Sequence, residues 1–491
     1  MLREKKLIFD AGLVFFISLI GSVFGYLIKM VLSRQMSLED FGLFYAVFTF
    51  VSFFVVFKDF GLGQSLTKLI PQFLAKKEYG KVKYSIKFVF LVNLIVGLIF
   101  AAIIIFLSGY LANNYFNNPL AKPLLVVLSI YFVIYSFYII FIHIFVGFQK
   151  SKLYSQNLFL INLSVLLGLF IFKDFNELSP AFAYLFASIL GVVFGVVALS
   201  RIFSFKHKTS YPGRLRSKLF SYGFPLLLAS LGFVIIGQID TLLLVKFRTL
   251  AEVGVYNVIL PTAMLLITLG SSLALVILPL ISEYWAKQKF KELSDIIKLI
   301  YKKVFALIVP IALLVFIFSD LILKILFGEL FISGAVALKI LCIGAIFFSV
   351  ATINNNILVA IGRPRAVTKI ILFAAALNLI LNLILIPPYG IVGAAVATSV
   401  AYLVVLIFST YKVGKSIKLK IPVFDWLKTF ISGAIFISVV ALLKNILVLD
   451  LIYEIMIVLI LSSLVYIFLL HIFNILTFRQ LANFLRHRMH E

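Results

Sequence analysis

Runs of about 20 apolar residues follow one another along this sequence, and they constrain its fold more than any other feature. Of its 491 residues, 63% are hydrophobic and only 13% are charged, whereas about a quarter of the residues in soluble domains are charged. Lipid offers no partner for backbone N–H and C=O groups, so a run of this length spans a membrane as a helix. We therefore predict an all-α polytopic membrane protein.

The runs predict about fourteen spanning helices. The first follows the basic segment Met1–Lys6 and is longer than the core of a cleavable signal peptide, so we expect it to be retained. The spans are expected near residues 9–33, 41–62, 87–108, 123–148, 154–173, 180–202, 219–245, 253–279, 303–327, 334–360, 366–386, 390–411, 427–448 and 452–476.

The positions of the basic residues predict the orientation. If the N-terminus lies inside, about 34 of the 44 Lys and Arg residues fall in or beside cytoplasmic loops. The formal charge of +25 therefore marks inner loops and does not indicate binding of nucleic acid. We expect a multi-pass protein of the cell (plasma or inner) membrane with both termini in the cytoplasm.

An internal repeat relates the two halves of the chain. Six spans, an even number, separate the copies, so both halves enter the membrane from the same side as a parallel repeat with a cavity between them. A shift of 212 positions aligns Gly25 with Gly237, Leu32 with Leu244, Arg34 with Lys246, Leu38 with Leu250, Gly42 with Gly254 and Phe44 with Tyr256.

The repeat predicts the domain organisation. We expect an N-terminal six-helix bundle at 1–202, a basic cytoplasmic linker with Pro212 at 203–218, and a C-terminal six-helix bundle at 219–412. Residues 413–491 have no counterpart in the repeat, so they form an added helix pair and a cytoplasmic tail.

Charged residues inside the spans are candidates for function, because each costs about 2.5–3.5 kcal/mol on insertion scales. Lys29 lies on a small and polar face with Ser18, Ser22, Gly25 and Ser33, and Lys339 is a second candidate to bind substrate in the cavity. The alternative for both lysines is that the side chain snorkels to the membrane interface.

Two aspartates are candidates for gating or coupling. Asp240 lies one residue from the repeat equivalent of Lys29, so the two side chains are hypothesised to form an outer gate across the pseudo-two-fold axis. Asp59 follows Lys58 at the inner end of the second span, and its alternative role is a local ion pair.

Amide side chains complete the predicted cavity. Asn356 lies in the tenth span, and Asn378 and Asn382 lie one helical turn apart in the eleventh. As a set they predict a hydrated lumen able to hydrogen-bond sugars, although for any single amide the favoured alternative is that it bonds one helix to another.

The sequence contains no pattern typical of an enzyme. Its five histidines are scattered and no acid pair lies in a large loop, so we expect neither a catalytic nor a metal site, and no cofactor. The single cysteine, Cys342, cannot form an internal disulfide.

Two stretches carry a family resemblance. LSRQMSLEDFGLF at 32–44 and the segment 362–398, with GRPR, NLILNLILIPPYG and IVGAAVAT, resemble the polysaccharide-biosynthesis (Wzx-like) flippases of the multidrug/oligosaccharidyl-lipid/polysaccharide exporter superfamily. The resemblance implies two six-helix bundles that alternate between inward-open and outward-open states and pass a lipid-linked oligosaccharide to the outer leaflet. The related lipid II flippases also carry two added helices, but they favour cavity arginines where this chain has lysines.

The leading hypothesis is therefore a flippase for a polyprenyl-diphosphate-linked oligosaccharide, with cavity cations meeting the diphosphate. We expect the protein to contact membrane lipids, and either H+ or Na+ to be the coupling ion. The alternative is a cation-coupled multidrug or metabolite exporter of the same superfamily.

Overall fold

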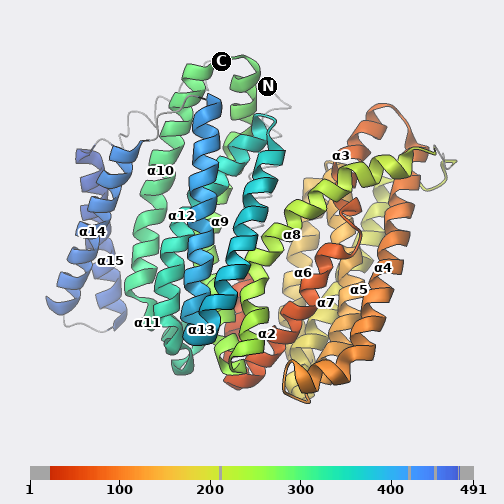
Figure 1. Cartoon of the computed structure of the whole chain (residues 1–491), viewed down its shortest axis with the longest axis horizontal. Helices are drawn as coiled ribbons and strands as arrows, with labels where there is room; N and C mark the ends of the chain where they lie inside the picture. Colours follow the sequence, from red (N-terminus) through yellow and green to blue (C-terminus); the bar gives the residue numbers. More distant parts are fainter. Residues whose placement is uncertain are drawn as a thin grey trace. The chain divides into compact units, whose positions relative to one another are not determined.

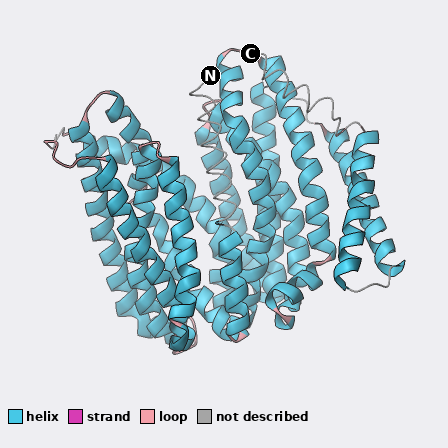
Figure 2. Ribbon diagram, turned by 180° about the vertical axis from the view of Figure 1, so that it is seen from behind, coloured by secondary structure: helices cyan, strands magenta, loops and turns pink. Residues whose placement is uncertain are grey.

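The computed structural model of the chain describes residues 21, 23–208, 213–417, 422–446, 451–473 and 475. The start of the first expected span with Ser18 and Ser22, Pro212 of the linker, and the C-terminal tail beyond residue 475 lie outside these residues. Every regular element in the described part is a helix (Figures 1 and 2). The predicted fold class is confirmed.

Eleven helical segments among the described residues are long and apolar enough to cross a membrane. The long helices are α2 (Leu38–Phe53), α4 (Tyr79–Asn114), α5 (Ala121–Gly147), α6 (Ser151–Ile171), α7 (Ser179–Ile202), α8 (Leu215–Phe247), α9 (Leu250–Ala286), α10 (Phe290–Ile317), α12 (Ala335–Ala360), α13 (Pro364–Ile417), α14 (Val423–Ile446) and α15 (Leu451–Ile472). Two shorter helices are α3 (Leu62–Ala75) and α11 (Ser319–Phe327), and three 3-10 turns are η1 (Phe54–Phe57), η2 (Lys173–Leu178) and η3 (Glu329–Gly334).

Helix α13 covers two expected spans, 366–386 and 390–411. Its helical path is interrupted at Gly390, whose φ of 54° and ψ of −131° no helix contains. Glycine tolerates this backbone because it has no Cβ. The interruption falls at the first residue of the span expected at 390–411, directly after the expected loop.

The second expected span, 41–62, is broken before it ends. Helix α2 stops at Phe53, the turn η1 follows, and Phe60 and Gly61 have positive φ angles of 51° and 79° before α3 begins. Residues 62–75, expected as part of an inner loop, form α3. A break in a membrane helix must satisfy its own backbone groups, and Asp59 does so here, as described below.

The described residues pack as two compact units. The first unit holds the chain up to Pro261 together with Lys324–Gly334 and Ile371–Ala401, and the second holds Thr262–Leu323, Ala335–Ile370 and the chain from Tyr402. In the first unit α4 packs against α5, and α5 and α6 both pack against α7. In the second, α10 packs against α12 and α14, and α14 packs against α15.

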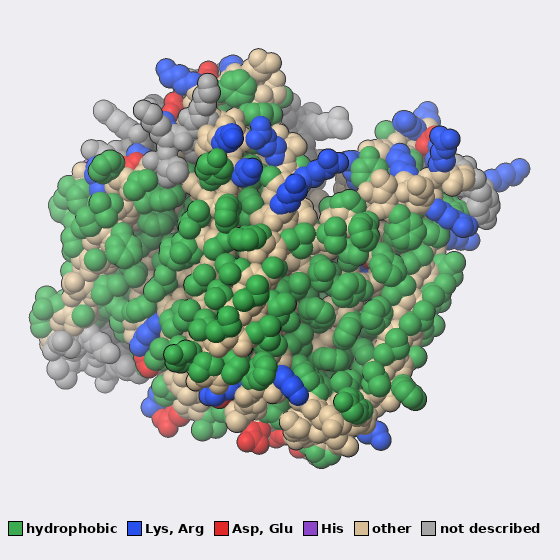
Figure 3. Space-filling model, in the orientation of Figure 1, with side chains coloured by type: hydrophobic (Ala, Val, Ile, Leu, Met, Phe, Trp, Pro, Cys, Tyr) green, Lys and Arg blue, Asp and Glu red, His purple; other side chains and the backbone are tan. Residues whose placement is uncertain are grey.

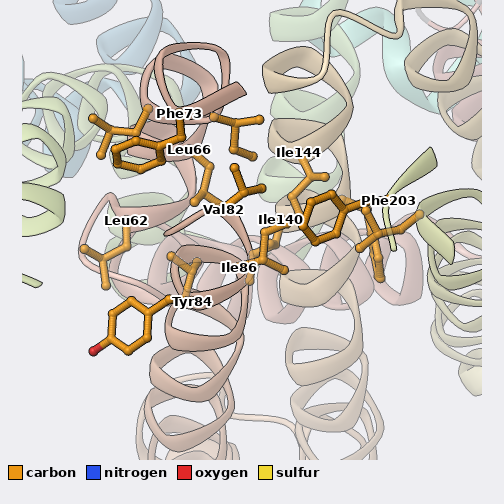
Figure 4. Packing of buried hydrophobic residues seen from close by; sticks show 14 of the residues in the cluster. Leu62, Leu66, Phe73, Val82, Tyr84, Ile86, Ile140, Ile144 and Phe203 are labelled. Atoms are coloured by element: carbon orange, nitrogen blue, oxygen red, sulfur yellow. The ribbon is translucent and has the colours of Figure 1, made fainter. Parts of the chain in front are cut away.

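The core of the first unit gathers where α3, α4 and α5 meet (Figure 4). Apolar side chains from the three helices interlock there and are almost fully excluded from solvent. They include Leu66, Phe73, Val82, Ile86, Ile140 and Ile144.

The outward flank of α4 has the opposite character, because large apolar side chains such as Leu98 and Phe106 are exposed along it. Figure 3 shows hydrophobic side chains over this flank and Lys and Arg side chains gathered where α3 ends and α4 begins. An apolar flank that ends in a basic rim is typical of a helix that contacts lipid.

Candidate functional site

A buried carboxylate is the centre of a polar cluster in the first unit. Asp240 of α8 is fully excluded from solvent. Its Oδ2 accepts hydrogen bonds of 2.5 Å from the hydroxyls of Tyr256 and Thr398, and its Oδ1 accepts one of 2.5 Å from the amide of Asn382. The amide of Asn378 donates to the Thr398 hydroxyl at 3.2 Å. Helices α8, α9 and α13 thus converge on one acid.

Two oxygens of this cluster are left without partners. The side-chain oxygens of Asn378 and Asn382 are buried and accept no hydrogen bond among the described residues. A buried acceptor without a partner is costly, so a bound water or ion is one group that would satisfy these oxygens. Carboxylate, amide and hydroxyl oxygens are the ligands of hard cations, and a carboxylate also binds a proton. The cluster is therefore suited to a small cation or a proton.

Neither histidine nor cysteine is among the described hydrogen-bond partners of Asp240. No group of three or more His, Cys, Asp or Glu residues suited to a metal lies within the described part of the chain. The carboxylate of Asp240 is the single acid of its cluster, and the other polar groups are neutral.

Lys29 lies in the helical segment 23–35. Its ammonium donates to the backbone oxygen of Asn257 at 2.6 Å and lies 3.9 Å from the ring centre of Tyr45. In the described part of the chain no ion pair joins Lys29 to Asp240. The two charges instead contact consecutive residues of α9, because Tyr256 bonds Asp240 and Asn257 bonds Lys29.

Asp59 organises the break between α2 and α3. Its carboxylate accepts the backbone N–H groups of Gly61 at 3.0 Å and Gly63 at 2.8 Å, and the ammonium of Lys58 lies 3.4 Å from it. Lys58 is 6% exposed and Asp59 is 1% exposed, so this ion pair is buried. The carboxylate caps N–H groups at the start of α3 that have no acceptor within the helix. This explains how an interrupted helix is tolerated here.

The remaining predicted site residues lie in the second unit. Lys339 of α12 forms an ion pair of 3.2 Å with Asp320 of α11, and both side chains are partly exposed. Asn356 is half-buried on α12. Their roles in binding substrate stay predictions.

The sequence analysis missed two members of the Asp240 cluster. Tyr256 was noted only as the repeat partner of Phe44, and Thr398 only as the last residue of the IVGAAVAT stretch. Nothing local distinguishes them, because each acts through a partner at least 16 positions away. The pairing of Asn378 and Asn382 on one helical face was visible from their spacing.

Comparisons with known proteins agree with this picture. The family described as "Polysaccharide biosynthesis protein" matches residues 10–285, and the family MatE matches residues 225–384. An uncharacterized membrane protein of Methanocaldococcus jannaschii is 31% identical over 437 residues, which is 86% of this chain and 86% of that protein. The probable low-salt glycan biosynthesis flippase Agl15 of Haloferax volcanii is 27% identical over 239 residues, 48% of this chain and 50% of that protein.

Solved structures share the fold. The lipid II flippase MurJ in an inward closed conformation matches with a TM-score of 0.74 at 17% identity, over 96% of this chain and 99% of that chain. A multidrug resistance MATE family transporter of the MOP superfamily, in an inward-facing conformation, matches with a TM-score of 0.69 at 15% identity, over 81% of this chain and 95% of that chain.

Proposed function

Because the chain belongs to the polysaccharide biosynthesis protein family, as a flippase of the MOP superfamily, we propose that it moves a polyprenyl-diphosphate-linked oligosaccharide across the membrane. Transport runs from the cytoplasmic to the outer leaflet by alternating access and serves the synthesis of a cell-surface glycan. The relative whose printed name includes a glycan flippase supports this substrate class.

The observation that carries the proposal is the buried polar cluster around Asp240. Transport against a gradient needs a group whose occupancy differs between two states of the protein. We assign this role to Asp240, because three donors contact its carboxylate and two unpartnered amide oxygens lie beside it. The carboxylate of Asp240 and the amide oxygens of Asn378 and Asn382 would be the ligands of a bound Na+, whereas a bound H+ would need the carboxylate alone.

The test is glycan export by the purified protein in lipid vesicles. The substrate is a polyprenyl-diphosphate-linked oligosaccharide, and its arrival in the far leaflet is measured by an added glycosidase. A Na+ gradient and a pH gradient are applied separately, so the ion that accelerates export identifies the coupling ion. We expect Asp240→Asn to abolish the acceleration.

Asp320→Asn is the matched control, because it neutralises an exposed acid of the same protein. This variant should keep gradient-driven export. Wild-type acceleration in Asp240→Asn would refute coupling through this site, and absence of export by the wild-type protein would refute the glycan substrate.

A cation-coupled multidrug or metabolite exporter is the second candidate. The match of the MatE family over residues 225–384, which include Asp240, favours it. Efflux of a fluorescent cationic dye from the same vesicles, with no response to the lipid-linked glycan, would support this alternative.

The proposed location is the cell membrane, with both termini in the cytoplasm. The concentration of Lys and Arg in the expected inner loops supports this orientation. Reporter fusions after Glu491 and within residues 203–218 should both report cytoplasm, and an external signal from either fusion would reverse the orientation.

A further inference from the structure

Two glycines related by the internal repeat meet in the first unit. A Cβ built on Gly42 of α2 would lie 1.8 Å from the backbone oxygen of Leu250, and one on Gly254 of α9 would lie 2.8 Å from the backbone oxygen of Leu38. Helices α2 and α9 therefore cross with backbone against backbone, as small residues permit in membrane proteins. We call this crossing the glycine junction.

Beside the glycine junction, a proline exposes a backbone oxygen. In a helix the oxygen of residue 257 accepts the N–H of residue 261, but residue 261 is a proline and has no N–H. The ammonium of Lys29 donates a hydrogen bond of 2.6 Å to this oxygen. The same device occurs in α10, where Pro310 frees the oxygen of Ala306 and the hydroxyl of Tyr466 takes it at 2.9 Å.

Among the described residues, no countercharge is paired with Lys29. Its described neighbours are the Asn257 oxygen and the ring of Tyr45, and no described carboxylate forms an ion pair with it. An ionised phosphate is a stronger partner for an ammonium than a neutral carbonyl oxygen, because the attraction between opposite charges is added to the hydrogen bond.

Gly25 lies one helical turn from Lys29 on the same helical face. A Cβ built on Gly25 meets no described atom within 4 Å, and the same holds for its repeat partner Gly237. Among the described residues, this face of the segment 23–35 is therefore not packed tightly at the level of Gly25.

We propose that Lys29 is a two-position cation. While the glycine junction is closed, its ammonium is bound to the carbonyl that Pro261 exposes and ties the segment 23–35 to α9. When α2 and α9 part, the ammonium leaves this oxygen and binds a phosphate oxygen of the diphosphate lipid. This rests on the proposed function for the identity of the ligand, and it replaces the expected Lys29–Asp240 pair.

The ligand opens the junction because it binds Lys29 in one state only. A ligand shifts an equilibrium by its difference in affinity for the two states, and the bound carbonyl excludes phosphate from the ammonium in the closed state. The adjacent Tyr256 belongs to the Asp240 cluster, so cation binding there acts on the same turn of α9.

Two variants distinguish the carbonyl-bound position of Lys29 from the phosphate-bound position. Lys29→Met removes the ammonium from both positions. Pro261→Ala restores a backbone N–H in α9, and this N–H binds the Asn257 oxygen and frees the lysine. Both should open the junction, but they should change phosphate binding in opposite directions.

Opening of the glycine junction is measured by labelling a cysteine that replaces Ser33, in a background with Cys342→Ser. Ser33 is 8% exposed. The labelling rate of this cysteine by a membrane-impermeant maleimide should rise about tenfold or more in both variants, the effect of losing one hydrogen bond to a charged group. Pro310→Ala is the matched control, since it refills the other proline-freed carbonyl without touching Lys29 and should leave this rate unchanged.

Phosphate binding is measured with geranylgeranyl diphosphate, using protein in nanodiscs. Pro261→Ala should bind it more tightly than the wild type, and Lys29→Met should lose about tenfold or more in affinity. Equal affinity in Lys29→Met and wild type, or an unchanged labelling rate in Pro261→Ala, overturns the proposal. Neither readout contains a glycan or an ion gradient, so a failure of glycan export is a separate result.

Discussion

Replacing Gly42 with alanine should disrupt the glycine junction, and the structure gives the size of the effect. The new Cβ would lie 1.8 Å from the oxygen and 2.7 Å from the carbonyl carbon of Leu250, both backbone atoms that no rotamer change can move away. Carbon–oxygen contacts settle near 3.3 Å, so α2 and α9 must separate by about 1.5 Å. Inserting a methylene-sized group into a packed interior costs about 1–3 kcal/mol.

The intrinsic preference of alanine for helices acts in the opposite direction, by about 1 kcal/mol. Gly25→Ala and Gly237→Ala measure this helix-preference term alone, because both are helical positions with no described atom near the added Cβ. The difference between Gly42→Ala and these controls is therefore the strain itself. Gly254→Ala should fall between them, since its nearest contact is 2.8 Å.

The assay is thermal unfolding of the purified variants in detergent. We expect Gly42→Ala to melt several degrees below Gly25→Ala, and the Ser33 cysteine to become more accessible in the same variant, because parting the helices relieves the clash. A melting temperature for Gly42→Ala equal to or above that of Gly25→Ala would contradict the close crossing of α2 and α9.

Three further outcomes are expected. Tyr466→Phe should lower the free energy of unfolding by about 1 kcal/mol, and should have little effect when Pro310→Ala has already refilled the carbonyl; melting curves of the double-mutant cycle decide this. Asp59→Ala should destabilise the protein by about 3–5 kcal/mol because it leaves a buried ammonium unpaired, and Asp59→Asn, which keeps an acceptor oxygen, by less; equal losses would show that the cap is unimportant. Lys339→Ala should lower glycan export in vesicles while Asp320→Asn, which frees the lysine without removing it, should not; unchanged export in Lys339→Ala would assign that lysine to its surface ion pair alone.

The sequence by itself determined the features that depend on local composition. The length and apolarity of the runs predict membrane helices without reference to their neighbours, although the second run is broken after Phe53. A charged residue inside such a run is rare and costly, so the sequence alone identified Lys29 and Asp240 as candidate functional residues. The spacing of Asn378 and Asn382 also placed both amides on one helical face.

Only the tertiary structure decided which partner each of these groups has. The repeat placed Lys29 and Asp240 at nearly equivalent positions, but repeat symmetry relates backbones and leaves the direction of a long side chain to local packing. Asp240 is satisfied by donors from α9 and α13, among them Thr398, which lies 158 positions away. Lys29 is bound to a backbone oxygen that exists as a free acceptor only because residue 261 is a proline and because α9 passes beside segment 23–35. The proline is visible in the sequence. The approach of the ammonium to the carbonyl depends on the packing of two helices, because Lys29 and Asn257 are 228 positions apart.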